Sequence, residues 1–225
     1  MIAVARNPQL DAAGFVLAGG QSSRMGRDKA LVEFAGQPMV ARALNILKQA
    51  GLSASIGGAH TDLSRFALVI ADPLHENSLG PLAGICSALS ETSVQYAVFL
   101  PVDLPLIPSS LVEHMLDHAR ITGAPITVPS AGGFTQTFPA VIDRAALPAL
   151  QLRLENSDRG CLSAFKAASE ALNRPLTSLP VEFLLQSGKI ADPQGLAPSF
   201  WFLNINDSRD LERAQSAAAR SSRLI

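Results

Sequence analysis

Short apolar runs alternate with amphipathic stretches along the first half of the chain. Four apolar runs are typical of buried strands, at residues 15–18, 53–56, 66–70 and 96–103. Three stretches carry apolar residues at helical spacing, at residues 38–51, 81–89 and 109–119. This alternation over residues 14–130 is typical of βαβ units, so it predicts an α/β fold with a mostly parallel sheet.

The second half of the chain is less regular. Its predicted strands are residues 125–130, 137–143 and 200–206, and its predicted helices are 144–155, 161–172 and 207–220. We expect Asp207 to cap the last helix and Ser109 or Ser110 to cap the helix at 109–119. Residues 186–199 predict a long surface loop, and the whole chain, 1–225, predicts one domain.

Composition narrows the class of protein. Of the 225 residues, 48% are hydrophobic, which is enough for a substantial core. The net charge of −1 gives no excess of positive charge for binding nucleic acid or an anionic membrane. No apolar stretch reaches the roughly 18 to 20 residues of a membrane span, and we expect no signal peptide. Two cysteines without a C-x-x-C pattern predict a reduced, cytoplasmic setting.

The segment "LAGGQSSRMGRDKA", residues 17–30, predicts a phosphate-binding loop. It lacks the spacing of a Walker A loop, because five residues separate Gly20 from Gly26 and Arg27 follows, and it is not G-x-G-x-x-G. Its glycines still allow backbone amides to approach a phosphate, and Arg24 and Lys29 can neutralise one. The segment follows the first predicted strand, at the edge where open α/β sheets bind ligands.

Polar residues also end three other predicted strands. Asp103 follows the most apolar strand and is suited to holding Mg²⁺ against nucleotide phosphates, and Asp72 lies on the same predicted edge. Asn206 offers another oxygen ligand, although Asn206 or Asp207 serving only as a helix cap remains an equal alternative. For Asp103 as well, a turn-capping role is the simpler alternative.

Other catalytic patterns have little support. His114 and His118 have the spacing of a zinc pair, but the glutamate of the H-E-x-x-H motif is missing. No G-x-S-x-G motif indicates a serine hydrolase. Cys86 lies among apolar helix residues and is expected in the core.

Four motifs in this order resemble the molybdenum cofactor guanylyltransferases. They are "LAGGQSSRMGRDKA", "LGPLAGI", "PVDLPLIP" and "FLNINDSRDL", and together they extend over residues 15 to about 215. The resemblance implies a Rossmann-like three-layer α/β/α fold of the glycosyltransferase-type nucleotidyltransferases. It also implies a nucleotide-binding half at about 14–130 and an acceptor-binding half at about 131–225.

The resemblance further implies a reaction and its residues. The family transfers GMP from GTP, with Mg²⁺, to the terminal phosphate of molybdenum cofactor and releases pyrophosphate. Arg24, Lys29 and Asp103 would be catalytic, and Asp103 would hold the metal, with Asn206 as a further ligand. The residues implied at the nucleotide are Leu17, Ala18, Gly19, Gly20, Lys29, Asp72, Gly80, Pro81, Leu82 and Asp103.

The chain departs from the family pattern at two places. Gly57-Gly58 stands where a polar nucleoside contact is common, and "GCLSAF", residues 160–165, lacks a basic residue, for which Arg153 and Arg159 are candidate replacements. No acceptor-binding residue is assigned. A transient contact with enzymes that make or receive the cofactor is compatible with this chemistry, and no motif marks its surface.

Three alternatives to the guanylyltransferase remain open. They are a cytidylyltransferase of the same cofactor, a nucleotidyltransferase for another small phosphate, and a non-catalytic nucleotide-binding domain. Gly20 favours GTP over CTP, because the CTP-using relatives tend to have L-A-A-G at this place. Asp28-Lys29 replaces the Pro-Lys pair of many sugar-phosphate enzymes.

Overall fold

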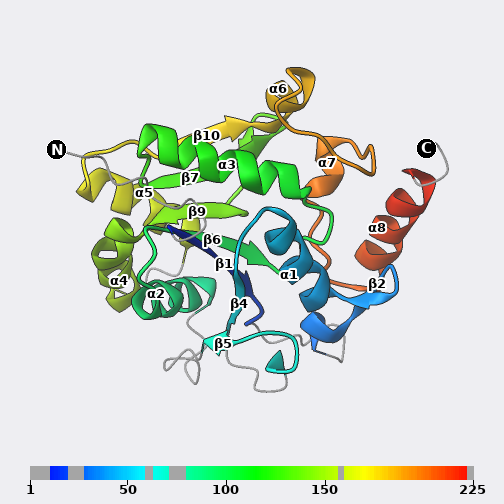
Figure 1. Ribbon diagram of the computed structural model, residues 1–225, viewed down its shortest axis with the longest axis horizontal. Helices are drawn as coiled ribbons and strands as arrows, with labels where there is room; N and C mark the ends of the chain where they lie inside the picture. The colour runs from blue at the N-terminus through cyan, green and yellow to red at the C-terminus, as the bar shows by residue number, and fades with distance from the viewer. Residues whose placement is uncertain (1–10, 20–27, 59–62, 71–79, 157–159, 222–225) are drawn as a thin grey trace.

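The computed structural model describes residues 11–19, 28–58, 63–70, 80–156 and 160–221. Within them, an eight-stranded sheet has the order β10-β7-β9-β6-β1-β4-β5, and β8 pairs with β7 (Figure 1). Its strands are β1 (Ala12–Leu17), β4 (Ala54–Gly57), β5 (Val69–Ile70), β6 (Tyr96–Pro101), β7 (Ile126–Ala131), β8 (Phe134–Thr135), β9 (Ala140–Asp143) and β10 (Thr177–Pro180).

Most of the sheet is parallel, which confirms the predicted fold class. β1 pairs in parallel with β4 and β6, β4 with β5, and β10 with β7. β9 is antiparallel to both of its neighbours, β6 and β7. β9 therefore joins the strands of the second half of the chain to those of the first.

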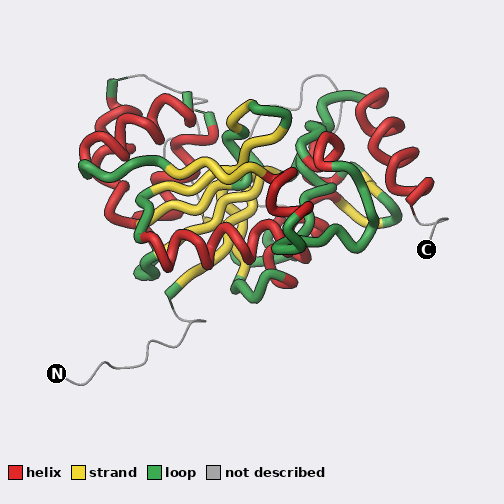
Figure 2. The backbone as a smooth tube through the Cα atoms, turned by 90° about the horizontal axis from the view of Figure 1, so that it is seen from above, coloured by secondary structure: helices red, strands yellow, loops and turns green. Residues whose placement is uncertain are grey.

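Helices cover both faces of the sheet, so that the strands lie in a central layer (Figures 1 and 2). One buried cluster includes α1 (Met39–Gln49) and α3 (Ser109–Thr122), and the other includes α2 (Pro81–Glu91), α4 (Leu147–Glu155) and α5 (Cys161–Ala171). β1 contributes to both clusters, because successive strand residues point to opposite faces. Val16 packs in the first cluster, and Phe15 and Leu17 pack in the second.

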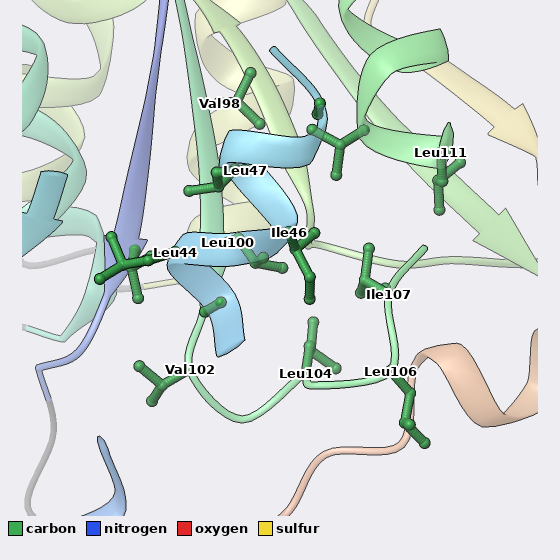
Figure 3. Packing of buried hydrophobic residues seen from close by; sticks show 14 of the residues in the cluster. Leu44, Ile46, Leu47, Val98, Leu100, Val102, Leu104, Leu106, Ile107 and Leu111 are labelled. Atoms are coloured by element: carbon green, nitrogen blue, oxygen red, sulfur yellow. The ribbon is translucent and has the colours of Figure 1, made fainter. Parts of the chain in front are cut away.

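The first cluster fixes the chain that follows β6. Figure 3 shows Leu44, Ile46 and Leu47 of α1 beside side chains of β6 and of residues 102–107. Leu104 and Ile107 are 4% and 3% exposed, so this segment is anchored in the core immediately after Asp103. Burial of such side chains contributes roughly 1.5–3 kcal/mol each, which holds the turn at Asp103 in place.

The predicted strand at residues 200–206 is wrong. Residues Pro198–Trp201 form the short helix α7, and the residues after it belong to no strand. The apolar run reflects burial rather than pairing, because Trp201 and Ile205 are fully buried. The Trp201 indole Nε1 also donates to the Asp192 carboxylate at 3.1 Å.

The remaining elements confirm the prediction in part. The last helix, α8 (Ser208–Ser221), is confirmed, and Asp207 accepts hydrogen bonds from two amides of its first turn. α3 instead follows Pro108 without a side-chain cap, since the Ser110 hydroxyl bonds to the backbone of Ala191. Elements absent from the prediction include β2 (Glu33–Phe34), β3 (Gln37–Pro38), β8, β10 and α6 (Val181–Gln186). None of the helices in the described ranges is long and apolar enough to cross a membrane.

Candidate functional site

The candidate site lies at the carboxyl ends of β1, β4 and β6. These strands are adjacent and parallel, so their following loops meet at one edge of the sheet. Backbone hydrogen bonds continue past the strands, from the Val102 N–H to the Leu17 carbonyl at 3.1 Å and from the Ala18 N–H to the Gly57 carbonyl at 3.0 Å. The loops that carry Gly19, Gly58 and Asp103 are therefore aligned with one another.

Lys29 reaches this edge from a short 3₁₀ helix, η1 (Lys29–Leu31). Asp28 caps η1 by accepting a hydrogen bond from the Ala30 N–H at 3.0 Å. Ala30 is fully buried. The turn that begins with Lys29 is therefore held by the Asp28 cap and by the packing of Ala30 in the core. The local sequence Asp-Lys-Ala thus positions the lysine.

The ammonium of Lys29 joins two residues that are far away in the sequence. Its Nζ lies 2.8 Å from Asp103 Oδ2 and 2.9 Å from Asn206 Oδ1. The Lys29 and Asp103 side chains are 21% and 23% exposed, so the ion pair is partly shielded from water. The structure therefore brings together three of the residues that the sequence suggested.

The C-terminal segment is fastened to the same place. The Ile205 N–H donates to the Asp103 carbonyl at 3.0 Å, and the Ile205 side chain is fully buried. The Asn206 N–H donates to Asp210 Oδ2 at 2.9 Å. Sequence reasoning missed Ile205 and Asp210, and the only signal for Asp210 was an acidic residue in the first turn of a predicted helix.

The other residues at this edge of the sheet expose their backbone rather than a side chain. Leu17 and Ala18 are each 6% exposed, so their side chains belong to the core, whereas Gly19 is exposed. Gly58 has φ +133°, and a Cβ placed there would lie 2.8 Å from the Gly19 nitrogen. The loops after β1 and β4 therefore approach so closely that Gly58 has no room for a side chain.

α2 packs against β1 and β4, and its Gly84 carbonyl would lie 3.7 Å from a Cβ at Gly57, at the end of β4. Gly80, with φ +78°, precedes Pro81 at the first position of the helix. Gly80 and Pro81 are exposed, whereas Leu82 is fully buried. The amides of this first turn carry the positive end of the helix dipole, which favours a negatively charged ligand nearby.

Some predicted residues lie outside the described residues, namely Gly20, Arg24, Asp72 and Arg159. Arg153, the other candidate for the missing basic residue, lies on α4, which packs against α2 and α5. Gly160 immediately precedes α5.

Other reactive groups in the described part of the chain fit catalysis poorly. Cys86 and Cys161 are free and buried, and burial raises the pKa of Cys161 to about 12, which keeps it as a protonated thiol near neutral pH. Across the described ranges, no cluster of three or more histidine, cysteine, aspartate or glutamate residues could hold a metal ion. The lysine–aspartate–asparagine group is therefore the best candidate for chemistry.

A mostly parallel sheet with a lysine and a carboxylate at its carboxyl edge is typical of α/β proteins that bind nucleotides or other phosphates. The model of the MobA-like NTP transferase domain matches residues 14–172. The chain belongs to this family of nucleotidyltransferases.

Curated relatives carry a more specific name. The chain is 33% identical to a molybdenum cofactor guanylyltransferase of Shewanella putrefaciens over 65% of its own length and 77% of the relative's. It is 36% identical to one of Shewanella loihica, over 73% and 78% of the two lengths. A solved structure of molybdopterin-guanine dinucleotide biosynthesis protein A from Archaeoglobus fulgidus has the same fold, with a TM-score of 0.72 at 22% identity, covering 92% of this chain and 99% of that one.

Proposed function

We propose that this chain is a Mg²⁺-dependent guanylyltransferase that transfers GMP from GTP to the terminal phosphate of molybdenum cofactor. The observation that carries the proposal is the convergence of Lys29, Asp103 and Asn206 at the carboxyl edge of the sheet. The names of the curated relatives support GTP and molybdenum cofactor as substrates.

The reaction needs little covalent help from the protein. An oxygen of the acceptor phosphate attacks the α-phosphorus of GTP, and a new P–O bond forms. The bond from the α-phosphorus to the oxygen bridging it to the β-phosphate breaks, and pyrophosphate leaves with the bonding electrons. Because the attacking phosphate is already ionised, no strong general base is required, and positioning and charge neutralisation dominate.

Lys29 is the fixed cation of this proposed site. Its ammonium already faces two oxygens within 3 Å, so it is oriented toward the edge where phosphates would lie. When nucleotide binds, negative phosphate oxygens compete with Asp103 for the ammonium, and each such charge-assisted bond is stronger than a neutral one. Arg24 is the second proposed cation of this site.

Asp103 and Asn206 are the proposed metal ligands. Mg²⁺ prefers oxygen ligands and is commonly held by one or two carboxylates together with substrate phosphates. The Asp103 carboxylate and the Asn206 amide oxygen both lie within 3 Å of the Lys29 ammonium, so the two oxygens converge on the position of one cation, which the ammonium takes here. The donor set therefore fits a magnesium ion that arrives with the nucleotide. When bound, the ion would neutralise charge on the phosphates and the leaving pyrophosphate.

The backbone surface around Gly19 is the proposed nucleoside pocket, formed by the exposed Gly19 and the start of α2 at Gly80 and Pro81. Leu17, Ala18 and Leu82 support this surface from the core. Gly20 and Asp72 are proposed nucleotide contacts from the sequence alone. We further propose a cytoplasmic location, with which the two free cysteines agree.

The deciding experiment measures pyrophosphate release from each of the four ribonucleotides, with molybdenum cofactor as acceptor and with or without Mg²⁺. We expect turnover with GTP that requires both Mg²⁺ and the acceptor. Turnover with CTP alone would instead indicate a cytidylyltransferase. Absence of turnover with every nucleotide, both with molybdenum cofactor and with other small phosphates as acceptor, would favour a binding domain. An unchanged rate after Asp103→Ala would remove Asp103 from the site.

A further inference from the structure

The first turn of α8 is linked to the candidate site by Asp210. Its Oδ2 accepts the Asn206 N–H at 2.9 Å, and Asn206 Oδ1 in turn accepts from Lys29 Nζ at 2.9 Å. The other acidic residue at this helix start, Asp207, bonds only to α8 amides in the described contacts, those of Arg209 and Asp210. The two carboxylates therefore have separate partners.

We propose that Asp210 is a positioning residue for the transferase site, acting through Asn206 on Lys29 and Asp103. This inference rests on the proposed function for the reaction that it affects. The Asn206 peptide is held on one side by Asp210, and the preceding peptide is held by the Asp103 carbonyl through the Ile205 N–H at 3.0 Å. These two bonds orient Asn206 so that its amide oxygen faces the ammonium.

The exposure of this segment explains why a second anchor is needed. Ile205 is fully buried and fixes the chain, but Asn206 itself is exposed. An exposed asparagine without a backbone partner samples several backbone and side-chain conformations, most of which turn Oδ1 away from Lys29. The Asp210 carboxylate removes that freedom, because a charge-assisted bond to a backbone amide is stronger than a neutral one.

A simpler explanation is that Asp210 only stabilises α8. An acidic residue in the first turn favours a helix through the dipole, and a side chain at this position commonly reaches back to an amide before the helix. That explanation predicts lower stability without any change at Lys29. The two explanations are therefore distinguished by a measurement at the site itself.

The test compares Asp210→Ala, Asp210→Asn and the control Glu212→Ala, which removes an exposed carboxylate of the same helix. We expect Asp210→Ala to lower kcat for GMP transfer about tenfold, in the range found when partners of ligand residues are removed. Asp210→Asn keeps an oxygen acceptor, so we expect it to restore most of the rate. Glu212→Ala should match the wild type.

A double-mutant cycle with Asn206 tests whether Asp210 affects kcat through Asn206. If Asp210 acts through Asn206, then Asp210→Ala should lower kcat little further in an Asn206→Ala background. Independent, multiplying losses would overturn the proposal. So would an Asp210→Ala variant with a wild-type kcat and a lower thermal midpoint, because that result identifies a helix cap alone.

A readout without substrate separates this inference from the proposed function. The side-chain amide signal of Asn206 in a ¹⁵N–¹H NMR spectrum is assigned by its loss in Asn206→Ala. We expect Asp210→Ala to move this signal in the same direction as Lys29→Met, because both lose the contact with the ammonium. If wild-type protein shows no transfer, the proposed function fails, and this shift alone decides the inference. An unmoved signal in Asp210→Ala would overturn it.

Discussion

At the scale of single residues, Lys29 is the centre of the site. Its ammonium bonds at once to a carboxylate that follows β6 and to an amide oxygen that precedes α8. The Lys29 and Asp103 side chains remain 21% and 23% exposed, so water screens the ion pair and it contributes on the order of 1 kcal/mol to stability. The arrangement is therefore better explained by ligand binding than by folding.

Replacing Lys29 tests this explanation. We expect Lys29→Met to lower kcat/KM for GMP transfer by about 10²-fold, the typical loss when one fixed donor to a developing charge is removed. The free energy of unfolding should change by less than about 1 kcal/mol. Steady-state pyrophosphate release and denaturant unfolding measure the two quantities. Lys48→Met, at an exposed lysine of α1, is the matched control.

A Lys29→Met variant with a normal rate and a large loss of stability would contradict this explanation. That outcome would make the lysine a structural residue of the described fold.

At the scale of elements, two loops are shaped by each other. The loop after β4 contains Gly58. A side chain on Gly58 would point at the backbone of Gly19 in the loop after β1. The neighbouring Gly57 has room, because a Cβ there would lie 3.6 Å from Leu17 Cδ2, 3.7 Å from the Gly84 carbonyl and 3.9 Å from the Val16 carbonyl, all ordinary contact distances. The departure from the family pattern at Gly57-Gly58 therefore has a steric reason at Gly58.

This pair of glycines gives a prediction with an internal control. Gly58→Ala requires a left-handed backbone at φ +133° and places a Cβ 2.8 Å from the Gly19 nitrogen, so we expect a loss of about 1–3 kcal/mol in unfolding free energy. Displacement of Gly19 should also weaken GTP binding about tenfold, equal to about 1.4 kcal/mol. Thermal unfolding and calorimetric titration with GTP measure both effects.

Gly57→Ala should leave both quantities near their wild-type values. Equal behaviour of the two variants would show that the close approach of Gly58 to Gly19 does not shape the pocket.

At the scale of the whole molecule, the sheet interleaves the two halves of the chain. β9 lies between β6 and β7, and it pairs with both. The C-terminal segment crosses back to the first half, where Ile205 meets the Asp103 backbone. The nucleotide-binding and acceptor-binding halves that the resemblance implies thus share one sheet.

This arrangement predicts a single cooperative unfolding transition for residues 1–225. Far-UV circular dichroism reports on both halves, and the single, fully buried Trp201 gives a fluorescence signal from the second half. We expect the two signals to give the same denaturant midpoint and the same slope, because neither half completes its sheet alone. Separate midpoints would show two independently folding units and would contradict the single-domain prediction.

Local sequence patterns were sufficient to predict most of the longer elements and the residue types of the site. The pattern of apolar residues predicted the buried strands near β1 and β6 and the helices α1, α2 and α3. A helix that is buried on one face repeats its apolar residues at helical spacing, and a strand that is buried on both faces is apolar throughout. The lysine of the glycine-containing segment and the polar residue after β6 were also visible, since both follow from short-range spacing. Short, half-exposed elements such as β2, β3 and β10 had too weak a pattern to predict.

Which of these residues meet depends on the three-dimensional packing of the chain. Asn206 is 177 positions from Lys29, and nothing in local spacing brings the two together. The strand predicted at 200–206 failed for the same reason, because pairing depends on a neighbouring edge that sequence periodicity does not describe. The burial of Ile205, together with the bond from its N–H to the Asp103 carbonyl at 3.0 Å, is what places Asn206 near Asp103 and Lys29. Long-range packing, rather than motif spacing, completes the site.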